Sequence, residues 1–119
     1  MLQKAINIFK THYDLGEVAG AKELTGGYNN HSFAITARRN NREIMYLVRR
    51  YNPRTAQKEI IFEHALVNHL NDNGFDLAAG VFPTKGGDTY VTEKQVAAGQ
   101  PVILCWAVFE YLEGDDGRV

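Results

Sequence analysis

The fold is decided by a stretch in the first third of the chain, Leu24-Thr25-Gly26-Gly27-Tyr28-Asn29-Asn30-His31-Ser32-Phe33-Ala34-Ile35. Its glycine pair and two asparagines separate two short apolar segments, so the pattern predicts two strands joined by a tight turn. Glycine tolerates positive φ and leaves the backbone N–H groups uncovered, which lets such a turn lie over an anion. A glycine pair alone also fits an ordinary turn, so the residues that follow it have to decide between the two interpretations.

Length and composition place the chain in an ordinary class. Its 119 residues suffice for one domain with a core, and its formal net charge of −1 argues against nucleic acid or an anionic membrane as a partner. The single cysteine, Cys105, lies in an apolar run and excludes an intramolecular disulfide and a multi-cysteine metal site. No stretch has the length of a membrane span or the pattern of a signal peptide, so we expect a cytoplasmic protein.

The apolar periodicity predicts a helix, three strands, a second helix and two more strands. The first helix is expected at about residues 2–14 with Gly16 as its stop, and the second runs from the N-cap candidate Thr55 to about residue 73. The expected strands are residues 22–24, 32–38, 43–51, 89–96 and 102–112. Turns are expected at residues 39–42, where Asn40 and Asn41 suit the left-handed conformations of a tight hairpin, and at residues 97–101. This order predicts an α+β fold, a five-stranded antiparallel sheet with one packed helix, preceded by an N-terminal helix. We divide it into a helix and linker (1–20) and a lobe (21–119).

Two charges fall where apolar side chains are expected. At 100° per residue, Glu63 projects from the middle of the apolar face of the second helix, with Ile60 and Leu66 on either side. An ionised carboxylate there is costly unless a cation pairs with it or it reaches a wet cleft. The third strand supplies a cation on each face at its end, Arg49 and Arg50, and one of them can meet Glu63. The pair is either a structural ion pair that orients the helix or a cation held toward the phosphates of a ligand.

Taken in order, the glycine turn, the strand-end arginine and the helix glutamate resemble the N-terminal lobe of a kinase-like phosphotransferase. The resemblance is to the aminoglycoside phosphotransferase/choline kinase/homoserine kinase superfamily, and it covers the chain from about Leu24 to Gly114. The Gly-Gly-x-x-Asn turn is similar to the nucleotide loop of that superfamily. Residues 46–51 look like its third strand, whose Lys or Arg contacts the α- and β-phosphates, and residues 109–114 look like its gatekeeper and hinge.

The resemblance implies a nucleotide-binding role for particular residues. Arg49 takes the position of the phosphate cation, with Arg50 as the rival if the register slips by one, and Glu63 is the carboxylate that pairs with it. The implied contacts to phosphates and adenine come from Gly26, Gly27, Tyr28, Asn29, Asn30, Leu47, Phe109 as gatekeeper, the Glu110 carbonyl and the Leu112 amide.

The resemblance also implies what is needed beyond these residues. Catalysis in the superfamily requires a His-Gly-Asp-x-x-x-x-Asn-like loop and a metal-binding aspartate from a C-terminal lobe, and neither motif occurs in this sequence. We therefore expect no catalytic residue and no metal site in this chain, and no activity from it alone. The intact enzyme would use ATP with Mg²⁺ and transfer the γ-phosphoryl to a hydroxyl of an amino-alcohol, aminoglycoside or similar metabolite bound through the missing lobe. The alternative is a non-catalytic α+β binding or interaction module with a purely structural Arg49–Glu63 pair.

The histidines predict no site of their own. His64 and His69 are five residues apart on the second helix, about 140° around its axis, so they do not share a face for metal binding. His31 follows the glycine turn and fits a solvent-exposed loop position better than a phosphate ligand. The sequence therefore leaves the histidines outside the predicted nucleotide site.

Overall fold

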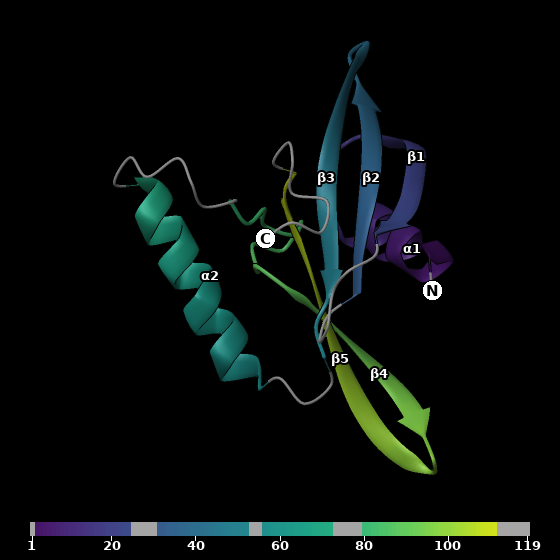
Figure 1. The fold of residues 1–119 in the computed structure, drawn as a ribbon, viewed down its shortest axis with the longest axis vertical. Helices are drawn as coiled ribbons and strands as arrows, with labels where there is room; N and C mark the ends of the chain where they lie inside the picture. The colour runs from purple at the N-terminus through teal and green to yellow at the C-terminus, as the bar shows by residue number, and fades with distance from the viewer. Residues whose placement is uncertain (1, 25–30, 53–55, 73–79, 112–119) are drawn as a thin grey trace.

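A five-stranded antiparallel sheet with a helix on either side forms the fold (Figure 1). The computed structural model describes residues 2–24, 31–52, 56–72 and 80–111. Its strands lie in the spatial order β1-β2-β3-β5-β4, which confirms the predicted α+β fold. The elements in chain order are α1 (Leu2–His12), β1 (Glu17–Leu24), β2 (His31–Arg39), β3 (Arg42–Arg50), α2 (Gln57–Asp72), β4 (Val91–Ala97) and β5 (Gln100–Glu110).

Two tight turns close the hairpins of the sheet. Asn40 and Asn41 adopt φ angles of 54° and 64° between β2 and β3, as the type I′ geometry of a two-residue hairpin requires. Ala98 and Gly99, at 52° and 77°, do the same between β4 and β5. The backbone twist of such turns matches the right-handed twist of paired strands, so these residues determine the register of both hairpins.

The first strand is longer than the sequence predicts. β1 begins at Glu17 rather than at Lys22 and pairs with β2 along its whole length, with a register irregularity between Val18 and Gly20. Its weakly apolar sequence does not indicate a strand, because pairing to β2 and not propensity holds it. The connection from α1 passes through Gly16 at φ 116°, where a Cβ atom would lie only 2.8 Å from the carbonyl oxygen of Arg38.

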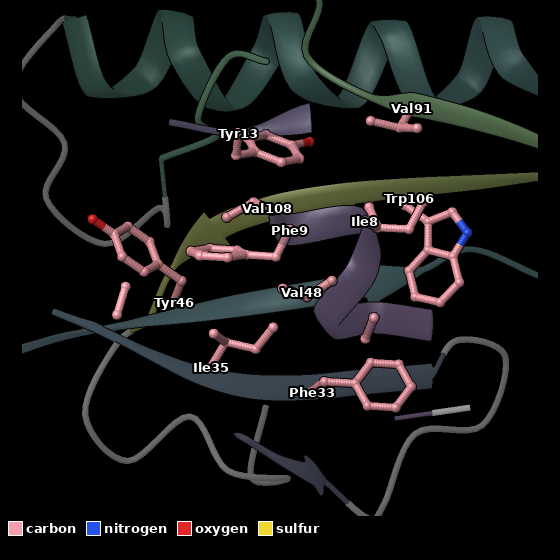
Figure 2. Close-up of a cluster of buried hydrophobic side chains, with 12 residues drawn as sticks. Ile8, Phe9, Tyr13, Phe33, Ile35, Tyr46, Val48, Val91, Trp106 and Val108 are labelled. Carbon is pink, nitrogen blue, oxygen red and sulfur yellow. The ribbon is translucent and has the colours of Figure 1, made fainter. Parts of the chain in front are cut away.

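One face of the sheet and α1 enclose an apolar, aromatic core (Figure 2). Phe9 from α1 packs against Tyr13 and Tyr46, and Phe33 stacks on Trp106 at a centroid distance of 6.1 Å. Offset and tilted ring pairs at such distances add to the hydrophobic gain from burial. This core, which we call the α1-side core, comprises Ala5, Ile8, Phe9, Tyr13, Phe33, Ile35, Ala37, Tyr46, Val48, Val91, Trp106 and Val108.

The other face of the sheet and α2 enclose a second, smaller core, which we call the α2-side core. It comprises Leu47, Tyr51, Ile60, Val81, Cys105, Ala107 and Phe109. Successive residues of a strand point to opposite faces, so β3 supplies Tyr46 and Val48 to the first core and Leu47 to the second. Figure 1 shows α2 on the opposite side of the sheet from α1.

Candidate functional site

The two arginines at the end of β3 lie on opposite faces of the sheet. Arg49 follows Leu47 on the α2 side, while Arg50 follows Tyr46 and Val48 on the α1 side. Only Arg49 forms an ion pair with Glu63, and its Nη1 atom lies 3.7 Å from Glu63 Oε1. Of the two cations that the sequence offers, Arg49 is the one that meets the helix carboxylate.

Aromatic rings surround the Arg49 guanidinium. Its central carbon lies 4.6 Å from the centre of the Phe109 ring and 5.6 Å from the centre of the Tyr51 ring. Both distances are within the range of cation–π attraction, which strengthens as the cation is desolvated. The guanidinium is thus held between two rings and a carboxylate, and about a quarter of the Arg49 side chain, 26%, remains accessible to solvent.

Glu63 lies at the edge of the α2 interface, which corrects its predicted place at the centre of a buried face. Its side chain is 43% exposed, and Leu66, predicted to bury beside it, is also exposed. The buried face runs instead through Ile60 and His64, one helical turn apart. The prediction misplaced the face because it took apolar residues alone to define it, whereas a hydrogen-bonded histidine occupies one of the two buried positions.

Tyr51 holds the carboxylate of Glu63. The Tyr51 hydroxyl donates to Glu63 Oε1 over 2.5 Å. Burial, and then the hydrogen bond and charge of Glu63, raise the pKa of Tyr51, while Arg49 lowers it. The hydroxyl therefore keeps its proton at neutral pH and remains a donor. No role was predicted for Tyr51, although its alternation with Leu47 and Arg49 places it on the same face of the strand.

His64 is the second site residue that the sequence analysis missed. Its Nε2 atom lies 2.9 Å from the Tyr51 hydroxyl oxygen, and its Nδ1 atom lies 2.8 Å from Thr89 Oγ1. The ring is 1% exposed, and burial is the largest influence that lowers its pKa, against the opposing charge of Glu63. The available signal was its spacing of four residues from Ile60, which puts both on one face of a helix.

The glycine turn itself, with Gly26, Gly27, Tyr28, Asn29 and Asn30, lies outside the described residues. The strands that carry it are described. Leu24 pairs with Ser32, and Ser32 pairs with Arg49 on the next strand. Leu24 and Ser32, on the two strands that flank residues 25–30, therefore lie level with Arg49 at the same end of the sheet. His31, at the start of β2, is exposed and lies 3.8 Å from a carboxylate oxygen of Glu23, so it points to a neighbouring side chain.

The predicted adenine residues lie next to the arginine. Leu47 and Phe109 are directly paired across β3 and β5 and are both buried in the α2-side core, with Leu24 and Tyr111 partly buried against it. The backbone N–H of Glu110 donates to the carbonyl of Gly80 over 2.8 Å. Leu112, the last predicted contact, lies outside the described residues. The structure thus brings Leu47, Phe109, Arg49 and Glu63 to one face of the sheet.

Two further observations concern metal binding and membrane spans. Within the described part of the chain, no cluster of three or more His, Cys, Asp or Glu side chains could hold a metal ion. Neither helix in the described residues is long and apolar enough to cross a membrane.

Comparison with known families identifies the class of protein. The family model of the phosphotransferase enzyme family (APH) matches residues 20–119. The match covers most of the chain, so the chain belongs to this family, and the resemblance inferred from the sequence is confirmed. A comparison with curated proteins found no match.

Proposed function

We propose that this member of the phosphotransferase enzyme family binds ATP on the α2 side of its sheet. It would serve as the N-terminal lobe of a cytoplasmic enzyme that transfers the γ-phosphoryl to a hydroxyl of an amino-alcohol, aminoglycoside or similar metabolite. The observation that carries the proposal is the position of Arg49. It lies at the end of β3, beside Glu63 of α2, and level with Leu24 and Ser32 on the two strands that flank the glycine pair.

The geometry of the ion pair suits a phosphate ligand. At 3.7 Å the Glu63 carboxylate attracts the Arg49 guanidinium from beyond hydrogen-bond distance, so it does not take up the N–H groups that a phosphate would use. A guanidinium presents its donors in a planar fork that matches phosphate oxygens. Because phosphoryl transfer depends mainly on positioning and charge stabilisation, a cation held in this way is a useful contribution to the reaction.

The remaining contacts follow from the same face. Leu47 and Phe109 would form an apolar surface for the adenine ring, and the backbone of Glu110 and Leu112 would bind its edge. Gly26, Gly27, Tyr28, Asn29 and Asn30 would cover the phosphates with their N–H groups. The described residues contain no group of three or more candidate metal ligands, so we assign them no step that involves Mg²⁺ and name no catalytic residue among them.

A titration with Mg-ATP tests the proposal. Removing the charge in Arg49→Ala deletes a charge-assisted contact, so the dissociation constant is expected to rise roughly 10- to 100-fold. Arg50→Ala is the matched control, because it removes the same charge one residue away on the opposite face, and its dissociation constant is expected to stay within about twofold of the unaltered chain. Arg49→Lys should recover part of the affinity, since it restores the charge without the fork.

The outcome also decides the competing interpretation. Circular dichroism spectra of all variants establish that the fold is retained. If Mg-ATP does not bind, or if Arg49→Ala and Arg50→Ala weaken binding equally, the nucleotide role is wrong. The chain would then be a non-catalytic α+β binding or interaction module in which Arg49 and Glu63 form a structural pair.

A further inference from the structure

The Tyr51 hydroxyl lies between two hydrogen-bond partners but has only one proton to donate. Glu63 Oε1 is 2.5 Å away on one side, and His64 Nε2 is 2.9 Å away on the other. An ionised carboxylate can only accept a hydrogen bond, whereas a neutral imidazole can donate from one nitrogen and accept at the other. The proton of Tyr51 therefore belongs to Glu63, and His64 has to supply the hydrogen of the second contact.

This assignment determines the tautomer of His64. Nε2 carries the hydrogen and donates it to the Tyr51 oxygen, so in the neutral ring Nδ1 has a free lone pair. Thr89 Oγ1 lies 2.8 Å from Nδ1 and is the group that can donate to it. The hydrogen bonds then all run in one direction, from Thr89 to His64, from His64 to Tyr51 and from Tyr51 to Glu63.

The opposite direction is electrostatically unfavourable. If Tyr51 donated to His64 Nε2, its oxygen lone pairs would face the Glu63 carboxylate at 2.5 Å with no hydrogen between them. Burial would make that repulsion more costly than it is in water. A lowered His64 pKa agrees with the preferred direction, because it keeps the ring neutral near pH 7.

The hydrogen-bonded chain joins three parts of the fold on the α2 side. Tyr51 directly follows β3, Glu63 and His64 belong to α2, and Thr89 lies just before β4. Among the described side chains of α2, Ile60 and His64 are the two that are buried. Ile60 makes apolar contacts that lack direction, so the rotation of α2 about its own axis depends on directional bonds: those of His64, the bond from Tyr51 to Glu63 and the bond from Tyr90 to Gln57.

We propose that Tyr51, His64 and Thr89 form a one-way hydrogen-bond relay that holds Glu63, and through it Arg49, in the orientation that binds the nucleotide phosphates. The proposal rests on the proposed function, since it gives these three side chains a positioning role at the same site. None of them has to touch the nucleotide. Each acts on Arg49 through Glu63, so their effects should pass through the ion pair at 3.7 Å.

The first experiment determines the direction of the hydrogen bonds in the relay, in the absence of nucleotide. In the chain labelled with ¹⁵N-histidine, long-range ¹H–¹⁵N spectra should show His64 as the Nε2–H tautomer at neutral pH, with the signal assigned from the His64→Gln variant. Tyr51→Phe removes the acceptor of the Nε2 hydrogen and should mix the two tautomers, while Thr89→Val removes only the donor to Nδ1 at nearly constant shape and should leave the Nε2–H form. An Nδ1–H tautomer in the unaltered chain would overturn the relay.

The second experiment asks whether the relay positions Arg49. The Nε–H signal of Arg49 should exchange slowly with water in the unaltered chain, and faster in Tyr51→Phe, Thr89→Val and the reference variant Glu63→Gln. Tyr46→Phe is the matched control, because Tyr46 lies on the same strand but in the α1-side core. It should leave the Arg49 signal unchanged. If the Arg49 Nε–H exchanges with water as slowly in Tyr51→Phe as in the unaltered chain, the relay does not position the arginine.

The third experiment measures the consequence for binding. Tyr51→Phe and Thr89→Val should each weaken Mg-ATP roughly three- to tenfold, Thr89→Ser should recover the loss, and Tyr46→Phe should have no effect. Variants that lower the melting temperature but bind Mg-ATP normally would show a merely structural role and overturn the proposal. If the unaltered chain does not bind Mg-ATP, the proposed function fails, and the Arg49 signal alone then decides whether the relay holds the ion pair.

Discussion

The two faces of the sheet are built from the same strands but differ in chemistry. The α1-side core is apolar and aromatic, with five ring-bearing residues packed around Val48 and Ile35 (Figure 2). The α2-side core is smaller and continues directly into the chain of polar contacts from Thr89 to Glu63. The α1 side has the composition of a core that stabilises the fold. The α2 side combines buried apolar side chains with the charged pair of Arg49 and Glu63.

This difference shows how one strand can serve both purposes. Along β3 the side chains alternate, so Tyr46 and Val48 enter the α1-side core while Leu47 and Arg49 reach the site. A rigid apolar face behind the site reduces the freedom of the residues in front of it. A site on strands supported in this way keeps its geometry more closely than a site on loops.

The two helices also differ, in how many of their apolar side chains are buried. α1 precedes the region that the family model matches, yet Phe9 is fully buried in the α1-side core. α2 lies within the matched region, yet it presents Ile61, Phe62 and Leu66 to solvent. We therefore expect α1 to contribute more to the stability of this chain than α2, which is held by fewer buried side chains.

The largest expected effect comes from the same substitution in the two helices. Phe9→Ala should lower the free energy of unfolding by about 3–5 kcal/mol, because Phe9 is 0% exposed and its removal leaves a cavity. Phe62→Ala should change it by no more than about 0.5 kcal/mol, because Phe62 is 63% exposed. Urea unfolding followed by circular dichroism measures both. Equal losses of unfolding free energy in the two variants would contradict the expectation that α1 contributes more to stability than α2.

A smaller effect is expected from two neighbouring isoleucines in α2. Ile60 is 1% exposed and Ile61 is 51% exposed, so Ile60→Ala should cost about 2–4 kcal/mol and Ile61→Ala less than about 1 kcal/mol. The same unfolding measurement compares them. A larger loss in Ile61→Ala would mean that α2 turns a different face to the sheet and that Glu63 and His64 are placed differently.

The smallest expected effect is a dependence on pH that belongs to the α2 side alone. Burial lowers the pKa of His64 below its ordinary value of 6.5, so the unfolded chain takes up the proton first as the pH falls. This contribution to stability is complete above the unfolded pKa and is lost as the pH falls through the folded pKa. The unaltered chain should therefore lose more stability than His64→Gln between about pH 7.5 and pH 5.5.

Unfolding free energies at the two pH values test this expectation. The three other histidines are present in both proteins, so the difference between the two losses reports His64. An equal loss in both proteins would show that His64 does not titrate differently on folding. The α1-side core should contribute equally to the stability loss of both proteins, because His64 lies on the other face of the sheet.

Much of the fold could be predicted because its signals are local. The Asn40–Asn41 turn, the alternation of β3 and the spacing of apolar residues in α1 each depend on neighbours within a few positions. The start of β1 at Glu17 could not be predicted, since that strand is held by its pairing with β2. The family resemblance could also be recognised from the sequence, because it rests on the order of short motifs along the chain.

The site was only partly predictable, because its contacts join residues distant in sequence. The pairing of a strand arginine with Glu63 was expected, and the structure brings Arg49 to it. The roles of Tyr51 and His64 were not expected, since their bonds connect β3, α2 and Thr89 only after the sheet and helix have packed. A histidine on an apolar helix face gives little sequence signal until its partners are known.

The fold class, the order of the elements, the hairpin turns and the family could all be inferred from the sequence alone. Those properties follow from side-chain periodicity and backbone preference, which act over a few residues. Only the tertiary structure decided that Arg49, and not Arg50, faces Glu63, and that His64 is buried while Leu66 is exposed. The physical reason is that both choices depend on which face of the sheet α2 covers and on its rotation, which long-range packing and directional hydrogen bonds decide together.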